Sequence, residues 1–418
     1  MKYKALPLIY LVNEHFKNTL RFAIEMKDEI DLDALRYAVD QVQIRYPYFS
    51  VQVETEGEDY VLVDNARPFV IAEGEKPLCL CSAEANYHVM SFSVSGHTVY
   101  TDIVHFICDG NGFIPVAKTL AYYYIERRYG TDGIDTATIN LVSDPVAEEE
   151  YAYPYPDAPL PTEGGTPPTP PVNDPFVFDD SFFDSEGAYA YNLLIPQREL
   201  MACARANGGS PVSLISSLLY RGMAVLFPDS EKDIVFLIPH QYRKALGRPL
   251  SHDSLTRVFP VQLGRDMRDK SLEELNASLR EQIRRGSDMA ADIAAINGTL
   301  QLHAYFKTLS LAQKKAVMPG LAAKALLGHT FGVSYTGNIP WGGLEQYIRD
   351  AHGYAGENKR SGTLSIEVFT VGDYFSLCVM QPGKNPALVD TFMQQLAGEG
   401  VSCRIASEGR YEMPDCEI

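Results

Sequence analysis

The sequence predicts an α+β protein built from two layered domains. Segments with the two-residue period of strands alternate with segments of helical period on both sides of a proline-rich stretch, residues 151–175. No repeat of solenoid length replaces this alternation. The length of 418 residues allows two to three domains of about 150 residues each. We therefore expect an N-terminal domain over residues 1–150, a linker over 151–175 and a C-terminal domain over 176–418.

Composition and charge restrict the class of partner. Hydrophobic residues make up 46% of the chain and charged residues 22%, as is usual for a globular protein with a substantial core. The net charge of −18 disfavours nucleic acid and anionic membrane surfaces as partners. The chain has no apolar run of about 18 residues. Residues 1–12 lack a signal-peptide cleavage pattern, so we interpret them as the first strand.

The cysteines indicate a reducing environment. The chain has seven, an odd and scattered set, which favours free thiols in a cytoplasmic protein. Cys79 and Cys81 are the only close pair, and no histidine cluster stands beside them. We therefore expect no metal site.

The N-terminal half shows five clear elements. A helix over residues 31–46 carries one apolar stripe and is ended by Pro47. Strands follow over residues 49–53 and 60–63. A further strand ends at His105, and a helix over residues 113–129 comes after it.

The C-terminal half alternates in the same way. Ser210-Pro211 is a helix cap followed by proline, and Ser271–Glu274 is a capping box. The expected strands cover residues 188–195, 234–239, 256–263, 364–370, 375–380 and 401–405. The expected helices cover residues 197–206, a segment from 211 that buries Leu214, Leu218 and Val225, a segment from 271 to about 285, and residues 386–396. Residues 371–374 turn a hairpin.

His105 is the residue on which the functional interpretation depends. It lies at a strand end, before a loop in which Gly110 and Gly112 permit a tight turn into the next helix. An imidazole there can take and return a proton at neutral pH. The residues alone also allow a simpler interpretation, in which His105 is an ordinary half-buried histidine and Asp109 caps the loop.

The motif His-x-x-x-Asp-Gly over residues 105–110 resembles the active-site motif of the chloramphenicol acetyltransferase-like superfamily. Its position resembles the branch of condensation domains and alcohol acetyltransferases. Residues 30–47, ending in Arg45-Tyr46-Pro47, resemble the opening of condensation-type enzymes. Arg243 with the Leu246-Gly247 turn resembles a loop beside the acceptor channel, and residues 331–338 resemble the Ser-Asn-x-Gly region of alcohol acetyltransferases.

This resemblance implies two chloramphenicol acetyltransferase-like α/β sandwich domains with a cleft or tunnel between them. It also implies an acyltransferase that moves an acyl group from a thioester to a hydroxyl or amine. The implied catalytic residues are His105 as general base, Asp109 and Gly110. The implied substrate-binding residues are Arg243, Ser334, Tyr335 and Asn338.

The implied cosubstrate is acyl-CoA, with no permanently bound cofactor. An acyl-carrier protein is the alternative donor, but such carriers are usually acidic and a chain of net charge −18 would repel one. Lys314-Lys315 and Lys359-Arg360 are candidate contacts for the phosphates of CoA.

Two positions depart from the family pattern. Val104 stands where relatives often have a second histidine, and Phe49 stands where many have an arginine that pairs with the motif aspartate. A buried Asp109 would then need another cationic partner, for which Arg45 and Arg21 are the candidates.

Two rival functions stay open. One is a binding module that keeps the fold without the chemistry. The other is a hydrolase with a Ser-His-Asp triad, although no Gly-x-Ser-x-Gly elbow occurs in the chain. Cys108 lies within the motif, and we interpret it as a packing residue rather than a nucleophile.

Overall fold

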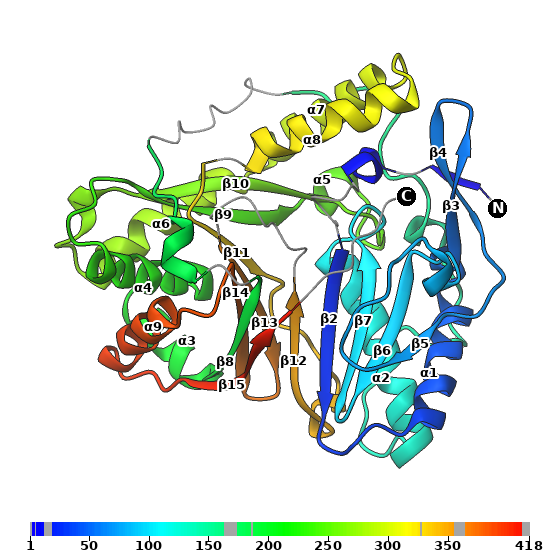
Figure 1. Ribbon diagram of the computed structural model, residues 1–418, viewed down its shortest axis with the longest axis horizontal. Coiled ribbons are helices and arrows are strands. Elements are labelled where there is room, and N and C mark those ends of the chain that lie inside the picture. The colour runs from blue at the N-terminus through cyan, green and yellow to red at the C-terminus, as the bar shows by residue number, and fades with distance from the viewer. Residues whose placement is uncertain are drawn as a thin grey trace.

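The structure is a computed structural model built around two large sheets. The described residues are 2–4, 6–11, 19–162, 174–184, 187–326, 328–354 and 364–411. The two sheets stand next to each other, with helices on the outer side of each (Figure 1). This arrangement confirms the predicted α+β class with two sheet-containing bodies.

The first sheet has five strands in the order β12-β2-β7-β6-β5. Its strands are β12 (Ile348–Tyr354), β2 (Thr19–Met26), β7 (Thr98–Val104), β6 (Met90–Ser95) and β5 (Ile71–Glu73). Helices α1 (Leu32–Arg45) and α2 (Gly110–Tyr129) pack against each other and share one core with this sheet. A small sheet beside it contains β1 (Lys2–Lys4), β4 (Asp59–Asp64) and β3 (Val51–Glu56).

The second sheet has seven strands in the order β10-β9-β11-β13-β14-β8-β15. Its strands are β10 (Thr256–Leu263), β9 (Ile234–Gln241), β11 (Phe331–Tyr335), β13 (Leu364–Val371), β14 (Tyr374–Gln381), β8 (Tyr189–Pro196) and β15 (Arg404–Arg410). The helices that cover it are α3 (Gln197–Ala206), α4 (Pro211–Leu226), α6 (Leu272–Gly286) and α9 (Ala387–Gly398). Three further helices are α5 (Arg243–Leu246), α7 (Met289–Phe306) and α8 (Leu311–Leu326).

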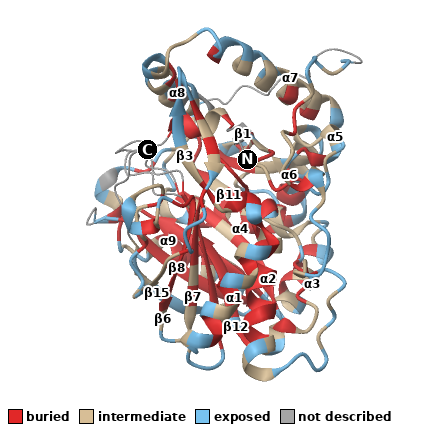
Figure 2. Ribbon diagram, turned by 90° about the vertical axis from the view of Figure 1, so that its right-hand side faces the viewer, coloured by how far each residue is buried: buried red, intermediate tan, exposed pale blue. Residues whose placement is uncertain are grey.

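Two separate hydrophobic cores define the two domains. One gathers residues of β2, β6, β7, α1 and α2, and the other gathers residues of the seven-stranded sheet and its helices. Buried residues follow the strands and the helix faces packed on them (Figure 2). Among the described helices, none combines the length and apolar character needed to cross a bilayer. The six described cysteines are free thiols.

Three helix caps explain where three of the predicted helices begin. Asp31, Ser210 and Ser271 each accept a hydrogen bond from a backbone N–H in the first turn of the helix that follows. Because such a cap satisfies donors that the helix itself cannot, it fixes where a helix begins. The predicted helices begin within one residue of α1, α4 and α6.

Three expectations about local structure were wrong. Val225 is 60% exposed rather than buried, because it lies in the last turn of α4 on the side away from the sheet. The last strand covers Arg404–Arg410 instead of residues 401–405. The N-terminal segment is not one strand: β1 stops at Lys4, and Pro7–Leu11 form a short 3₁₀ helix.

Residues beyond 176 contribute to the first domain as well as the second. Strand β12 pairs with β2 over its length, with His352 opposite Ala23. Phe306 of α7 and Met318 of α8 lie in the first core. Segments after residue 176 therefore belong to the first domain, and residue 176 does not separate all parts of the two domains.

The proline-rich stretch is packed at its start. Tyr155 is 7% exposed and its hydroxyl lies 2.6 Å from that of Tyr242, and Tyr153 and Leu160 pack in the same small cluster. Residues 163–173 of the expected linker lie outside the described residues.

Candidate functional site

His105 lies directly after the last residue of β7, the central strand of the first sheet. That end of the strand faces the second domain. Its side chain is partly buried. Its Nδ1 atom lies 3.4 Å from the hydroxyl oxygen of Ser254, in the loop before β10. That distance is long for a hydrogen bond, so the imidazole is oriented by a weak contact.

Asp109 ties the loop after His105 to the second domain. It caps α2 by accepting the N–H of Gly112 at 2.9 Å. The same carboxylate accepts two hydrogen bonds from Arg243, at 2.8 and 2.9 Å. It also accepts the backbone N–H of Leu255 and the hydroxyl of Thr256. One carboxylate therefore joins the start of α2 to two segments of the second domain.

Arg243 is the partner that replaces the arginine missing at Phe49. Both guesses made from the sequence were wrong, because Arg45 pairs with Glu150 and Arg21 pairs with Asp102. The guanidinium of Arg243 also donates to the carbonyl oxygens of Ser251 and Asp253, and the residue is 5% exposed. Such a buried and fully engaged side chain supports the loop rather than reaching a ligand.

The ion pair with Arg243 keeps the side chain of Asp109 negatively charged. Burial acts to raise the pKa of Asp109, but the charge and hydrogen bonds of Arg243, with those of Gly112 and Thr256, outweigh it. The pKa of Asp109 is therefore held below its ordinary value, and the carboxylate is ionised at neutral pH. By contrast, burial raises the pKa of the Cys108 thiol well above its ordinary value, which agrees with the packing role expected for that residue.

Arg45 supports the loop before α2 indirectly, through Glu150 and His252. Its guanidinium pairs with both carboxylate oxygens of Glu150, at 2.9 and 3.0 Å. The carbonyl of Glu150 accepts the backbone N–H of His252, whose ring contacts the carbonyl of Gly112. Burial lowers the pKa of His252 to about 4, so this histidine is neutral. The segment that ends at Pro47 thus supports the start of α2 without reaching the cavity.

Gly112 is required by a close backbone approach. A Cβ atom added there would lie 2.1 Å from the carbonyl oxygen of His252. We expect Gly112→Ala to lower the free energy of unfolding by about 1–3 kcal/mol, because backbone must shift to make room. Gly298 of α7 is the matched control, since a Cβ added there meets nothing within 4 Å. Gly298→Ala should stabilise by about 0.5–1 kcal/mol, as judged by thermal denaturation of both variants. A Gly112→Ala protein as stable as the parent would contradict this account.

A cavity of about 150 Å³ lies between the domains, next to His105. The first domain contributes His105, Asp109, Gly110, Asn111 and Phe113 to its wall. The second contributes Ser334, Tyr335, Thr336, Glu367 and Phe369. The site therefore exists only where the two domains meet.

The structure brings together most of the residues predicted to act at the site. His105, Asp109, Gly110, Ser334 and Tyr335 all line the cavity. Arg243 and Asn338 are outside the set of described residues that line it; the Asn338 side chain instead accepts a long hydrogen bond, 3.5 Å, from Thr370. Of the basic pairs, Lys314 is buried against Asp59 and the carbonyl of Glu58, so it is not available to a phosphate. Lys359 and Arg360 lie outside the described residues.

Among the polar residues of the cavity wall that were not predicted, three have ionisable side chains. They are Arg21 on β2, Tyr354 on β12 and Glu367 on β13. Glu367 alternates with apolar neighbours along its strand, which is the pattern of an ordinary solvent-facing residue. Only the approach of the other domain turns that face into a cavity wall, so no local signal could have identified it.

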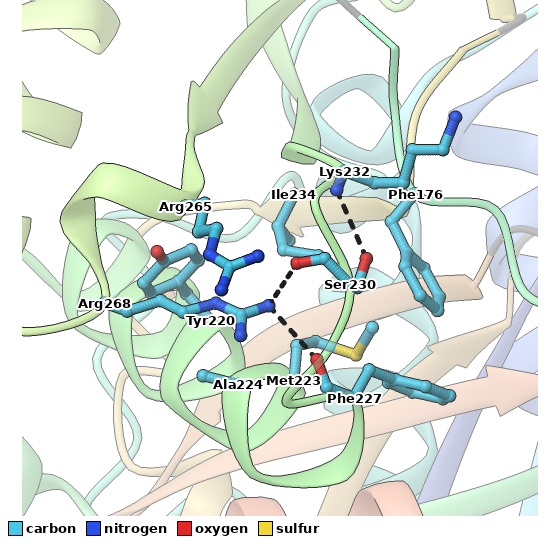
Figure 3. Close-up of a pocket in the computed structure, with 10 residues that line it drawn as sticks. All are labelled: Phe176, Tyr220, Met223, Ala224, Phe227, Ser230, Lys232, Ile234, Arg265 and Arg268. Atoms are coloured by element: carbon cyan, nitrogen blue, oxygen red, sulfur yellow. Dashed lines mark hydrogen bonds between the residues drawn. The ribbon is translucent and has the colours of Figure 1, made fainter.

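A second crevice in the C-terminal domain is too small to be a ligand site. It lies between the end of α4 and the start of β9 and has a volume of about 10 Å³, enough for at most one water molecule (Figure 3). Arg268 donates to the carbonyls of Phe227 and Ser230 there and closes the turn. The described residues that line this crevice do not line the cavity at His105.

Comparison by sequence finds no relative: no protein-family model matches the chain, and the search of curated proteins gives no match. Comparison by structure finds the same architecture in solved proteins. The TRI101 protein of F. graminearum, in a crystal structure with coenzyme A and T-2 mycotoxin, has a TM-score of 0.62 at 13% identity, over 96% of this chain and 99% of that chain.

Two other solved structures also share this architecture. Polyketide synthase associated protein 5 from Mycobacterium tuberculosis has a TM-score of 0.58 at 14% identity, over 93% of this chain and 95% of that chain. The first condensation domain of the CDA synthetase has a TM-score of 0.55 at 10% identity, over 94% and 96%. This protein therefore has the same two-domain fold as these three solved structures, which is the fold that the sequence resemblance implied.

Proposed function

We propose that this protein is an acyltransferase that moves an acyl group from acyl-CoA to a hydroxyl or amine acceptor, with His105 as general base. The observation that carries the proposal is the position of His105 on the wall of a cavity shared by both domains. The fold supports it, because TRI101 has the same fold and its crystal structure contains coenzyme A.

The reaction needs no covalent intermediate with the protein. The acceptor gives its proton to the ring nitrogen Nε2 of His105, since Nδ1 faces Ser254. The acceptor oxygen or nitrogen then forms a bond to the thioester carbon, and the carbon–sulfur bond breaks. The leaving thiolate takes that proton from Nε2 of His105 and departs as free CoA, which returns the histidine to its neutral form. A positioned base of this kind contributes about 10²–10⁴-fold to the rate.

The start of α2 supplies stabilisation for the developing oxyanion. Asp109 already occupies the N–H of Gly112, whereas the N–H groups of Gly110 and Asn111 are at helix positions that have no intrahelical acceptor. Both residues line the cavity, and the helix dipole favours negative charge there.

The other residues of the site have two kinds of role: some contact substrate, and others hold the loop in place. Ser334 and Tyr335 lie on the cavity wall, where they can contact substrate; burial raises the pKa of Tyr335, so its phenol is neutral. Asp109 and Arg243 are positioning residues, because each is held by the other.

The test is a thioester assay with a panel of acyl-CoAs, with and without alcohol and amine acceptors, read by thiol release and by mass spectrometry of the product. We expect CoA release that depends on the acceptor, together with an acylated acceptor. CoA release without an acceptor would indicate a hydrolase. No release with any donor, but binding of a small molecule, would indicate a binding module. Release only from acyl-carrier protein would overturn the choice of acyl-CoA as donor.

A further inference from the structure

Glu367 is an acidic residue on the wall of the cavity that contains His105. It lies on β13, opposite Ser334 of β11 and Cys378 of β14. Its carboxylate accepts a hydrogen bond from Ser365 at 3.3 Å and another from Ser334. Burial raises the pKa of Glu367 to about 7, and the serine hydroxyls only partly oppose this. The group is therefore mostly ionised at pH 8.

The other permanent charges on the cavity wall are neutralised in pairs. Arg21 is bound by both oxygens of Asp102, at 2.9 and 3.2 Å, and Asp109 is bound by Arg243. Within the described part of the chain, by contrast, the contacts recorded for the Glu367 carboxylate come from hydroxyl groups. Once Glu367 is ionised, the wall carries an uncompensated negative charge, which is costly unless a cation comes to it.

Aromatic rings complete the same wall. Phe22, Phe113, Tyr354 and Phe369 line the cavity, whereas the ring of Tyr335 packs against Phe375 in the second core. The Phe22 ring lies 5.1 Å from Phe369 and 5.6 Å from Phe113, between centroids. Ring faces attract cations, and aromatic cages bind ammonium groups, including quaternary ones. A carboxylate that is held by hydroxyl groups, on a cavity wall that also carries aromatic rings, thus matches an ammonium ligand and disfavours an anionic one.

We propose that Glu367 forms a subsite for an ammonium group of the acceptor, so that the preferred acceptor is a small amino alcohol whose hydroxyl reaches His105. This inference rests on the proposed acyltransferase function. Both residues line the same cavity of about 150 Å³, and the proposal requires one acceptor molecule to contact both. Glu367 then acts as a specificity-determining residue, because it binds a part of the acceptor that does not react.

The test uses two alcohols of the same shape that differ in charge, choline and 3,3-dimethylbutan-1-ol. With acetyl-CoA at pH 8, we expect the parent protein to acylate choline with the lower KM. Glu367→Gln should raise the KM for choline about tenfold or more, because an ionic contact is lost, and should leave the KM for the neutral alcohol unchanged. Glu54→Gln, on the exposed edge strand β3, is the matched control and should change neither value.

Melting temperatures measure binding at the subsite independently of the acyl-transfer reaction. Choline should raise the melting temperature of the parent protein more than the neutral alcohol does, and this difference should vanish in Glu367→Gln. Phe369→Leu removes a ring and leaves the carboxylate in place. This variant should weaken the binding of choline more than that of the neutral alcohol, and it provides the test if Glu367→Gln fails to fold.

The two proposals fail in different ways. Acylation of both alcohols with equal KM values that Glu367→Gln does not change would overturn the subsite and leave the acyltransferase standing. Absence of CoA release with the whole acceptor panel would overturn the proposed function, and the melting-temperature comparison would then decide the subsite alone.

Discussion

Replacing His105 by alanine is expected to lower thioester-dependent acyl transfer by about 10²–10⁴-fold, because the variant has no proton acceptor at the cavity. The fold should persist. His105 is only partly buried and its one recorded hydrogen bond is 3.4 Å long, so the free energy of unfolding should change by less than about 1 kcal/mol. Initial rates of thiol release and a thermal melt on the same samples measure both effects.

His97 provides a matched control at the opposite end of the same strand. It lies in the turn between β6 and β7, outside the described residues that line the cavity. His97→Ala should retain the parent rate. Full activity in His105→Ala would refute the role of His105 as general base.

Breaking the ion pair between Asp109 and Arg243 should produce the largest loss of stability. Arg243→Met leaves a buried carboxylate without its cation, and the expected cost is about 3–5 kcal/mol. Asp109→Asn should also be destabilising, because an amide cannot accept all the hydrogen bonds that the carboxylate receives. Both variants should lose activity, since the loop that carries His105 is no longer fixed to the second domain. Denaturant unfolding at pH 7 and the thioester assay measure these losses.

The double variant distinguishes an ion pair from two independent contacts. If the charges stabilise each other, the double variant should lose less than the sum of the single losses. The partly exposed pair of Arg221 and Glu399 is the control, and Arg221→Met should cost about 1 kcal/mol or less. Additive losses at Asp109 and Arg243 would contradict the coupling.

The pKa of Asp109 adds a pH dependence with a definite sign. Because the folded-state pKa is depressed, the ionised group contributes stability above its unfolded pKa, near 3.9, and this contribution is lost as the pH falls through the folded value. Arg243→Met removes that contribution. The stability difference between parent and variant should therefore be largest near neutral pH and shrink in acid.

Local signals predicted much of the secondary structure. Helix α3 covers the predicted residues 197–206, and the caps at Ser210 and Ser271 were identified from their spacing. Strands β2, β6 and β12 were not predicted. Strand β12 follows a long segment with weak periodicity, and it is stabilised by pairing with β2, more than 300 residues earlier in the chain. Such pairing depends on tertiary contacts and leaves little trace in a window of ten residues.

The sequence by itself determined the α+β fold class and the candidate motif from His105 to Gly110, because strand period, helix caps and motif spacing are all encoded within a few residues. Only the tertiary structure decided the partner of Asp109, which is Arg243, 134 residues away, instead of Arg45 or Arg21. It also decided that Glu367 lines the cavity and that Asn338 does not. The physical reason is the same in each case: the identity of a buried partner depends on how the two domains meet, and that contact is made by residues far apart in the chain.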